Sequence, residues 1–277
     1  MPIIHAVILG IVQGLAEFLP ISSSGHLIIV PWLLGWHDFV GRQGLEKAFD
    51  TALHIGTVIA VIAYFRKDLW RLVVAWFRSI GQRAVRTPEE RLAWLLILSS
   101  IPGAITGALL DNFITDHLGQ EWLIGIMLIV FGLVLYAVDR LPGERTDAEF
   151  ATRDAVLMGV AQAVALQPGV SRSGATISMG RWLGFSRDAA ARISFLMATP
   201  ITAGAAGYKM LKLQADGGIP HGFGGAFATG ILVSGVVGFA AIAALLGLIR
   251  TRSFTAFVVY RVLAGAAIVI IAATSLR

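Results

Sequence analysis

The chain has 277 residues, of which 56% are hydrophobic and 14% are charged, whereas a soluble domain of this size usually carries about 25% charged residues. This composition excludes an ordinary water-soluble protein and predicts a membrane protein. The absence of cysteine excludes disulfides, thiolate metal sites and a cysteine nucleophile, and the net charge of +5 comes with no nucleic-acid-binding motif.

Residues 3–34 are apolar but are interrupted midway by the polar segment SSSGH, so they do not predict a simple membrane span. The first residues, MPIIHAVILG, lack the basic region of a secretory signal peptide and are expected to belong to the mature protein. Gln13 and Glu17 are four positions apart and share one helix face. Pro20 is expected to end that helix. We interpret residues 3–34 as a re-entrant helical hairpin.

Three apolar stretches follow, at residues 48–65, 92–110 and 122–138, and each is close to the ~20 residues that a helix needs to cross a bilayer. The loop after the first stretch is rich in basic residues, namely Arg66, Lys67, Arg71, Arg78, Arg83, Arg86 and Arg91. Residues 111–121 contain no lysine or arginine. The positive-inside rule therefore places the basic loop in the cytoplasm.

A second interrupted stretch, residues 155–183, is broken by PGVSRSGAT and predicts another re-entrant hairpin. Apolar stretches at residues 193–209, 224–249 and 254–276 follow, which brings the expected number of spans to six. Alternation of the loops then places both termini on the outer face.

An internal duplication relates the two hairpins. A shift of 149 residues aligns AVILGIVQGLAEFLPISSSG with AVLMGVAQAVALQPGVSRSG, so that Gln13 matches Gln162 and Ser22 matches Ser171. Each half, residues 1–138 and residues 154–277, would hold one hairpin and three spans. An odd number of crossings inverts the second half relative to the first. The predicted fold is therefore an all-α polytopic membrane protein, a single integral membrane domain over residues 1–277 with an inverted repeat.

Irregular backbone at membrane depth is tolerated only where protein or a polar cavity surrounds it, because each unsatisfied N–H or C=O group in lipid costs several kcal/mol. The two interrupted turns are therefore expected to meet. Glu17 is the only acidic residue in the first 37 positions, and Arg172 is the only charged residue between Asp154 and Arg181. A buried ionisable residue in a membrane segment is a functional candidate, and the planar guanidinium suits a phosphate.

Hydroxyls, an imidazole, a carboxylate and a guanidinium, with no histidine cluster for zinc, fit phosphoryl transfer better than acyl transfer or redox chemistry. At this point a family resemblance is clear. VQGLAEFLPISSSGH resembles the (E/Q)xxxE signature with its trailing serines and histidine, and PGVSRSGAT resembles PGxSRSxxT. Both belong to the undecaprenyl-diphosphate phosphatase family, also called the bacitracin-resistance protein family.

The resemblance covers the whole chain and implies a hydrolase of the bacterial inner membrane that depends on Mg²⁺ or Ca²⁺. It implies removal of one phosphate from undecaprenyl diphosphate, recycling of the carrier lipid for peptidoglycan synthesis, and resistance to bacitracin. The site is expected to open to the periplasmic side. The implied catalytic residues are Glu17, Ser23, His26 and Arg172. The implied phosphate-binding residues are Ser22, Ser24, Gly25, Ser171, Arg172, Ser173, Gly174 and Thr176. The implied metal ligands are Gln13 and Glu17, with phosphate oxygens completing the set because Gln13 is not a carboxylate.

We expect Ser23 to attack the terminal phosphorus while His26 or Glu17 takes its proton, with attack by His26 or by an activated water left open. His54 reads as a satisfied core histidine that could also line the cavity. Arg261, inside the last span, is expected to pair across the bundle or to reach the interface. A lipid phosphatase family that shares the letters SGH and SR is excluded, because no histidine follows Arg172 at the required spacing.

A polyprenyl-phosphate transporter is the competing class, since an inverted repeat with broken helices is common among secondary carriers. A membrane scaffold without activity would not concentrate these polar groups in apolar hairpins. The expected partners are the polyprenyl diphosphate and membrane lipids, without nucleic acid, and the sequence leaves a homodimer open.

Overall fold

The structure is a computed structural model that describes residues 1–39, 43–215, 218–219 and 221–274. The described residues fold into α-helices, with one short 3₁₀ helix and a single isolated β-bridge between Arg145 and Phe185. The elements in chain order are α1 (Ile3–Phe18), α2 (Ser23–Leu34), α3 (Gln43–Tyr64), α4 (Arg66–Gly81), α5 (Pro88–His117), α6 (Glu121–Asp139), η1 (Asp147–Glu149), α7 (Thr152–Val164), α8 (Arg172–Trp182), α9 (Arg187–Ala215), α10 (Gly224–Ile249) and α11 (Thr255–Ala273).

Five of the six expected spans are confirmed as helices long and apolar enough to cross a membrane. They are Gly44–Tyr64, Pro88–Leu110, Glu121–Asp139, Gly224–Ile249 and Thr255–Ala273. The last of them was expected to reach residue 276, and residues 275–276 lie outside the described part of the chain.

The sixth expected span, residues 193–209, lies within α9, which is helical over 29 residues but is not among these five. Its sequence contains Ser194, Thr199 and Thr202 among small residues. Two of these hydroxyls bond to residues of α8. Part of α9 therefore faces polar side chains inside the protein, and its own hydroxyl residues make it less apolar than the five spans.

The basic segment after residue 65, which we expected to be a loop, contains the helix α4. α4 places Leu72 and Ala75 in the protein interior, while Trp70 and Phe77 are 70% and 62% exposed. The alternation of these positions has the helical period of about 3.6 residues. The arginines between them hid this pattern from a search for long apolar runs.

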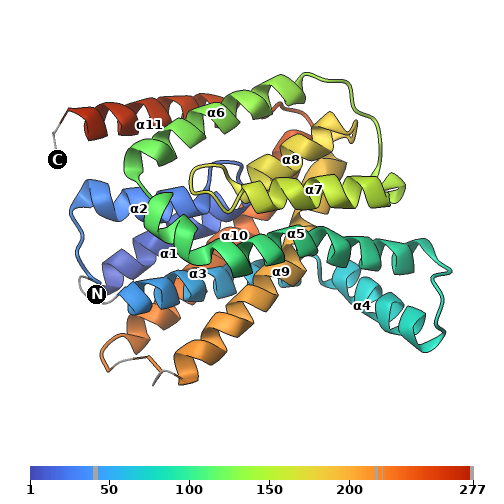
Figure 1. The fold of residues 1–277 in the computed structure, drawn as a ribbon, viewed down its shortest axis with the longest axis horizontal. Coiled ribbons are helices and arrows are strands. Elements are labelled where there is room, and N and C mark those ends of the chain that lie inside the picture. The colour runs from blue at the N-terminus through green and yellow to red at the C-terminus, as the bar shows by residue number, and fades with distance from the viewer. Residues whose placement is uncertain (40–42, 216–217, 220, 275–277) are drawn as a thin grey trace.

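The first interrupted stretch forms a hairpin of two helices. α1 ends at Phe18, and the backbone of Leu19 is extended (ψ 141°), because the ring of Pro20 disfavours helical geometry in the residue before it. α2 starts at Ser23. The two helices have 16 and 12 residues, fewer than the ~20 needed to cross a bilayer. α2 runs back toward the end of the molecule at which α1 begins (Figure 1).

The second interrupted stretch repeats this geometry. α7 and α8 form a hairpin that starts and finishes at the opposite end of the molecule (Figure 1). Ser22 and Ser171 are the N-caps of α2 and α8, with φ of 78° and 75°. The hydroxyl of Ser22 accepts from the Gly25 N–H and that of Ser171 from the Gly174 N–H. Residues paired by the sequence duplication therefore have the same backbone geometry and the same cap.

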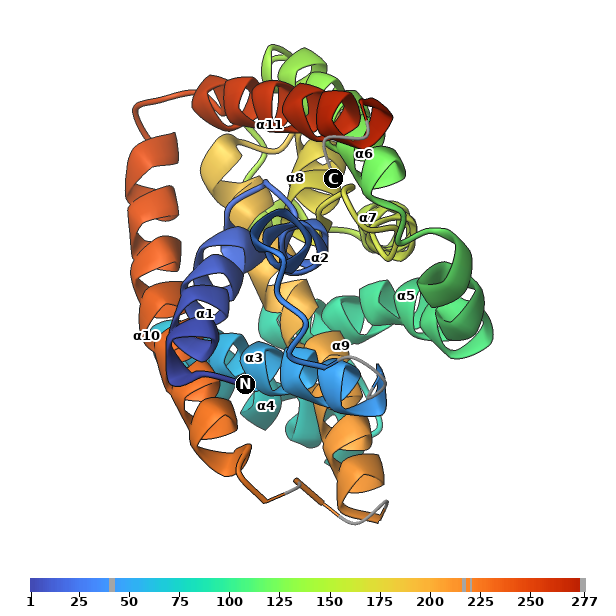
Figure 2. The ribbon, with the colours of Figure 1, turned by 90° about the vertical axis from the view of Figure 1, so that its left-hand side faces the viewer.

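Each hairpin packs against the other half of the chain. α1 lies along α10, and α7 lies along α5, while α6 and α11 pair with each other (Figure 2). Glycine permits the close approaches: a Cβ on Gly14 would lie 2.9 Å from the main-chain oxygen of Ser234, and one on Gly159 would lie 2.6 Å from that of Ser99. Small residues allow such helix contacts in membrane proteins.

α1 begins and α11 ends at one end of the molecule, and α4 and η1 lie at the other (Figure 1). The start of the first helix and the end of the last helix thus lie together, opposite the basic segment around α4. The two hairpin turns meet between these ends.

Candidate active site at the two hairpin turns

We call residues 19–25 the first tip and residues 168–174 the second tip. Two hydrogen bonds join them directly. The Gly169 N–H donates to Ser22 Oγ at 3.1 Å, and Ser173 Oγ donates to the carbonyl of Leu19 at 3.1 Å. The convergence expected from the cost of irregular backbone in lipid is therefore observed.

Glu17 and Arg172 form an ion pair across the tips. The Glu17 side chain is only 5% exposed, and the Arg172 guanidinium also donates to the Thr202 hydroxyl of α9. A buried carboxylate is costly unless it is paired and hydrogen-bonded. This pair brings together the two lone charges that the sequence placed in separate apolar hairpins.

The second oxygen of Glu17 accepts two further hydrogen bonds. Ser23 Oγ donates to Glu17 Oε2 at 2.6 Å, and Gln13 Nε2 donates to the same atom at 3.1 Å. The Ser23 hydroxyl therefore donates its proton to the carboxylate of Glu17, which lies just before the first tip. This is the arrangement in which a hydroxyl is activated as a nucleophile by a base.

A cavity of about 250 Å³ opens beside these groups. Its lining includes Glu17, Ser23, Ser24, Thr51, His54, Gln162, Ser171, Arg172, Thr202 and Lys209, together with apolar side chains. Five sequence-derived site residues are among them: Glu17, Ser23, Ser24, Ser171 and Arg172.

The remaining phosphate-binding candidates do not line the cavity. Ser22, Gly25, Ser173 and Gly174 make contacts within or between the tips, and Thr176 contacts α9. Ser22 joins the two tips, and the Gly25 N–H is bonded to it at 3.4 Å. Gly174 donates its N–H to Ser171 Oγ at 3.1 Å. The hydroxyl of Thr176 lies 2.6 Å from that of Ser194 in α9 and is fully buried. These residues shape the tips without lining the cavity.

His26 does not line this cavity. Its Nδ1 lies 2.7 Å from the carbonyl of Ser22, so Nδ1 carries a proton and donates it. Its Nε2 lies 2.6 Å from the hydroxyl of Tyr260 in α11. The ring is stacked on the Tyr260 ring. Both nitrogens are engaged on the side of the first tip that faces α11.

His54 lines the cavity instead, so the alternative left open by the sequence is confirmed and the reading as a core histidine is wrong. Its Nδ1 bonds to the carbonyl of Asp50 at 2.8 Å, and its Nε2 lies 3.7 Å from Glu17 Oε2. That distance is longer than a hydrogen bond. Thr51 stands one turn earlier in α3 and lines the same cavity. The i, i+3 spacing of these polar residues in an apolar span is the sequence signal that marks this face.

Arg261 neither pairs with an acidic residue in the ion pairs of the described chain nor reaches the surface. Its side chain is fully buried and donates to main-chain carbonyls of α6 and of both tips. The expected pairing across the bundle is therefore made with main-chain carbonyls, and the alternative of an interfacial position is wrong. A buried arginine can be satisfied by carbonyl oxygens alone, because each of its five N–H groups is a donor.

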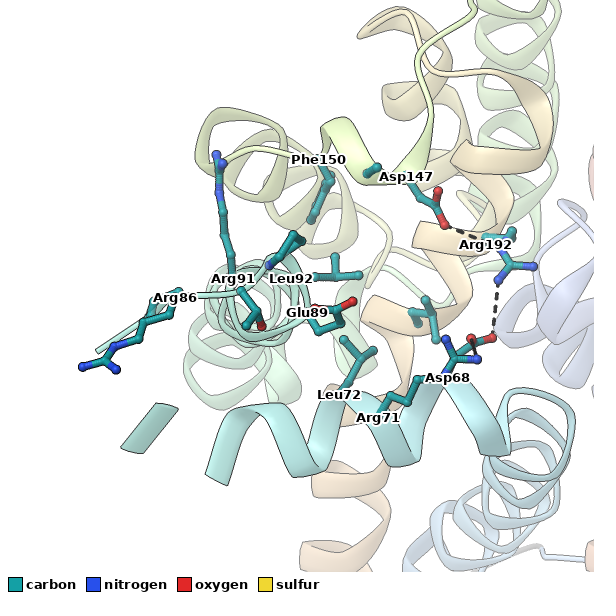
Figure 3. A pocket seen from close by; sticks show the side chains of 15 residues that line it. Asp68, Arg71, Leu72, Arg86, Glu89, Arg91, Leu92, Asp147, Phe150 and Arg192 are labelled. Atoms are coloured by element: carbon teal, nitrogen blue, oxygen red, sulfur yellow. Dashed lines mark hydrogen bonds and ion pairs between the residues drawn. The ribbon is translucent and has the colours of Figure 1, made fainter. Parts of the chain in front are cut away.

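A larger cavity, of about 570 Å³, lies at the other end of the molecule between α4, α5, η1 and α9. Figure 3 shows that Arg192 lies between Asp68 and Asp147, at 3.4 Å and 3.7 Å from their carboxylates. Arg192 is thus paired with two carboxylates of this cavity, and none of the lining residues belongs to either tip. We therefore place the chemistry in the smaller cavity.

The donor set fits a divalent cation only together with a phosphate ligand. No group of three or more His, Cys, Asp or Glu side chains that could hold a metal occurs among the described residues. The side-chain oxygens of Gln13 and Gln162 are buried without a hydrogen-bond partner, however. Such oxygens, with the carboxylate of Glu17, are the hard ligands that Mg²⁺ and Ca²⁺ prefer.

Comparison with known proteins gives one consistent result. Residues 6–267 match the family model described as Bacitracin resistance protein BacA. A protein named undecaprenyl-diphosphatase from a Nocardioides species is 47% identical over 98% of this chain and 97% of its own length. Proteins of the same name from Pelobacter propionicus and Aliivibrio salmonicida are 45% and 46% identical, covering 100% and 96% of this chain and 99% and 96% of their own lengths.

Proposed function

The chain belongs to the BacA family of bacitracin resistance proteins, and from this premise we propose that it is an undecaprenyl-diphosphatase whose reaction takes place in the cavity between the two tips. It is a hydrolase that converts undecaprenyl diphosphate to undecaprenyl phosphate and inorganic phosphate, which recycles the carrier lipid and opposes bacitracin. The relatives that cover nearly the whole chain carry this activity in their names.

One observation carries the assignment of the site. Glu17, Ser23 and Arg172 come from two hairpins far apart in sequence, yet they share one cavity and are linked through Glu17. A nucleophile, a base and a phosphate-binding cation are the groups that phosphoryl transfer needs.

The hydrogen bond from Ser23 to Glu17 supports Ser23 as the nucleophile and Glu17 as its base. Ser23 Oγ forms a bond to the terminal phosphorus, its proton passes to Glu17, and the bond from that phosphorus to the bridging oxygen breaks. Undecaprenyl phosphate leaves with the bridging oxygen. Water then hydrolyses the phosphoserine and releases inorganic phosphate. Arg172 neutralises the charge on the phosphate oxygens.

Two other nucleophiles were left open by the sequence. A water molecule activated by Glu17 would use the same cavity and the same carboxylate. Attack by His26 is disfavoured, because its Nδ1 is bonded to Ser22 and its Nε2 to Tyr260. Ser23 remains our assignment.

Glu17 and Gln13 are proposed to hold Mg²⁺ or Ca²⁺ together with phosphate oxygens. A bound cation would lower the negative charge of the diphosphate that meets the nucleophile. The unpartnered oxygen of Gln13 supports this assignment. In the present arrangement Gln13 turns its NH₂ group to Glu17, so its amide would have to rotate to offer the oxygen.

The hairpins are proposed to be re-entrant and the two halves to form an inverted repeat in the inner membrane. The matching caps of Ser22 and Ser171 support the repeat, and so does the exchange in which α1 packs on α10 and α7 on α5. The basic segment around α4 supports a cytoplasmic end, which leaves the first hairpin open to the periplasm.

Cysteines introduced singly in this cysteine-free chain test that orientation. Asp116→Cys should react with a membrane-impermeant thiol reagent from outside the cell, and Lys67→Cys should not. The reverse labelling pattern would invert the topology.

The activity is tested by phosphate release from the purified protein in detergent with undecaprenyl diphosphate, with and without a divalent cation. We expect cation-dependent release, and a loss of at least about 100-fold in Glu17→Gln, the size of effect seen when one transition-state-stabilising group is removed. Lys212→Gln, in α9 outside the cavity lining, is the control and should retain activity. Equal turnover in Glu17→Gln and wild type would remove Glu17 from the reaction.

The transporter alternative gains no support from the relatives reported above, which are named for diphosphatase activity. Movement of labelled lipid across proteoliposome membranes without phosphate release would favour it.

A further inference from the structure

Two consecutive residues of α11, Tyr260 and Arg261, reach the region of the tips. Tyr260 bonds to His26 of α2, directly after the first tip. Arg261 is fully buried and reaches both tips. Neither residue lines the cavity that holds Glu17, Ser23 and Arg172. Their contribution to the reaction must therefore act through other residues.

The guanidinium of Arg261 binds equivalent carbonyls of the two tips. Its Nη1 donates to the carbonyl of Pro20 at 2.9 Å, and its Nη2 donates to that of Gly169 at 3.0 Å. Pro20 and Gly169 are paired by the internal duplication. A third bond, from Nη2 to the carbonyl of Val170, is also 3.0 Å long. One planar group thus bridges the two halves of the molecule at the point where their irregular segments meet.

The same side chain is anchored to α6. Nε donates to the carbonyl of Leu128 at 3.0 Å, and Nη2 lies 3.4 Å from that of Met127. Gly132 makes room for it, because a Cβ at that position would lie 3.2 Å from the Cβ of Arg261. The bond to Leu128 would be enough to link α11 to α6. The three bonds to the tips link α11 to both hairpin turns as well.

Strained backbone explains why the tips need this support. Ser22 and Ser171 have φ of 78° and 75°, in the region that favours glycine. A non-glycine residue there costs on the order of 1–3 kcal/mol and persists only when its surroundings fix it. Arg261 binds the carbonyls one and two residues before Ser171 and two residues before Ser22. Ser23 and Arg172 directly follow these strained serines.

We propose that Arg261 is a positioning residue that fixes the first and second tips relative to each other, and thereby holds Ser23 and Arg172 at the spacing that the diphosphate requires. The bond between Tyr260 and His26 holds the start of α2 to the same helix. His26 then serves as a structural link between the first tip and α11. This inference rests on the proposed function for its catalytic part, whereas the placement of the tips can be measured without it.

Arg261→Lys is the central variant, because an ammonium group cannot span carbonyls that a planar guanidinium reaches together. Arg181→Lys is the matched control. Arg181 is also buried and donates to main-chain carbonyls, those of Leu141 and Phe185, at the far end of α8. Both variants should lower the melting temperature. Only Arg261→Lys should alter the tips.

Double electron–electron resonance measures the distance between two spin labels and thereby reports the placement of the tips. The labels are attached at Leu34→Cys and Trp182→Cys, the exposed last residues of α2 and α8. The chain contains no cysteine of its own. In nanodiscs we expect one narrow distance distribution for the labelled protein that is otherwise wild type and for its Arg181→Lys variant. We expect a shifted or broadened distribution for its Arg261→Lys variant. In the chain without spin labels, Arg261→Lys should lower kcat about 100-fold, the effect of misplacing a reacting group by about 1 Å. The change in KM should be smaller. Arg181→Lys should retain the wild-type kcat.

An unchanged distance distribution with wild-type kcat in Arg261→Lys overturns the proposal, as does an equal loss of kcat in Arg181→Lys. If Arg261→Lys does not fold, Gly132→Ala displaces the arginine while keeping its donors, and the same broadening is expected there. A wild-type distribution and kcat in that variant count against the proposal. Absence of phosphate release from the wild-type protein would instead refute the diphosphatase function and leave the distance result standing.

Discussion

The carboxylate of Glu17 forms an ion pair with Arg172 and accepts hydrogen bonds from the Ser23 hydroxyl and the Gln13 amide. The ion pair stabilises the charged carboxylate in a segment where an unpaired charge would be costly. The same contact leaves Arg172 ready to bind a phosphate when substrate enters. The chemistry of the site therefore depends on the bonds that Arg172, Ser23 and Gln13 make to the Glu17 carboxylate.

The bond from Ser23 to Glu17 leads to a prediction at this scale. Ser23→Ala removes the proposed nucleophile, and kcat should fall by at least about 1,000-fold, as in other enzymes that lose a member of a nucleophile and base unit. Ser24→Ala removes a neighbouring hydroxyl of the same cavity and should mainly raise KM. Phosphate release measured at several substrate concentrations separates the two effects. Comparable kcat in Ser23→Ala and wild type would favour attack by water.

The sequence predicted Glu17, Ser23 and Arg172 because polar residues in apolar segments stand out without any knowledge of the fold. It gave a place in the cavity only as the second reading of His54 and did not predict Thr202, because both lie on other helices and approach only when the chain is folded. The family resemblance implied a catalytic role for His26, whereas in the structure its two ring nitrogens are bonded to Ser22 and Tyr260. Adjacency in sequence does not decide the direction of a side chain.

At the scale of the helices, α3 and α10 approach so closely that a Cβ on Gly56 would lie 2.3 Å from the main-chain oxygen of Ile231. α3 carries His54 and α10 supports α1, so this contact holds two walls of the site together. Runs of apolar residues predicted the spans. They did not predict α4, whose apolar face is interrupted by arginine, or the polar face of α9.

Gly56→Ala is therefore expected to destabilise the protein by about 1–3 kcal/mol, the usual cost of adding a methyl group to a packed interior. Gly44→Ala in the same helix is the control, since nothing lies within 4 Å of its Cβ position. It should leave stability unchanged or slightly raise it. Thermal unfolding in detergent, followed by circular dichroism, compares the two variants. Equal melting temperatures would contradict the close packing of α3 on α10.

For the whole molecule, the duplication explains why the site lies between the two halves. Each half contributes one interrupted hairpin, and the hairpins meet where neither is exposed to lipid alone. The match between Ser22 and Ser171, found first by shifting the sequence on itself, corresponds to equal backbone geometry. The pairing of α1 with α10 and of α7 with α5 could not be predicted, because apolar helices carry little information about their neighbours.

The measurement that tests the central claim most directly is a double-mutant cycle on phosphate release with Glu17→Gln, Arg172→Lys and the double variant. If the two tips form one active site, each single variant loses about 100-fold or more in kcat/KM, and the double variant is little worse than the poorer single one, since residues that act as a unit are not additive. Losses that simply multiply would show that the two tips act separately and would contradict a shared site.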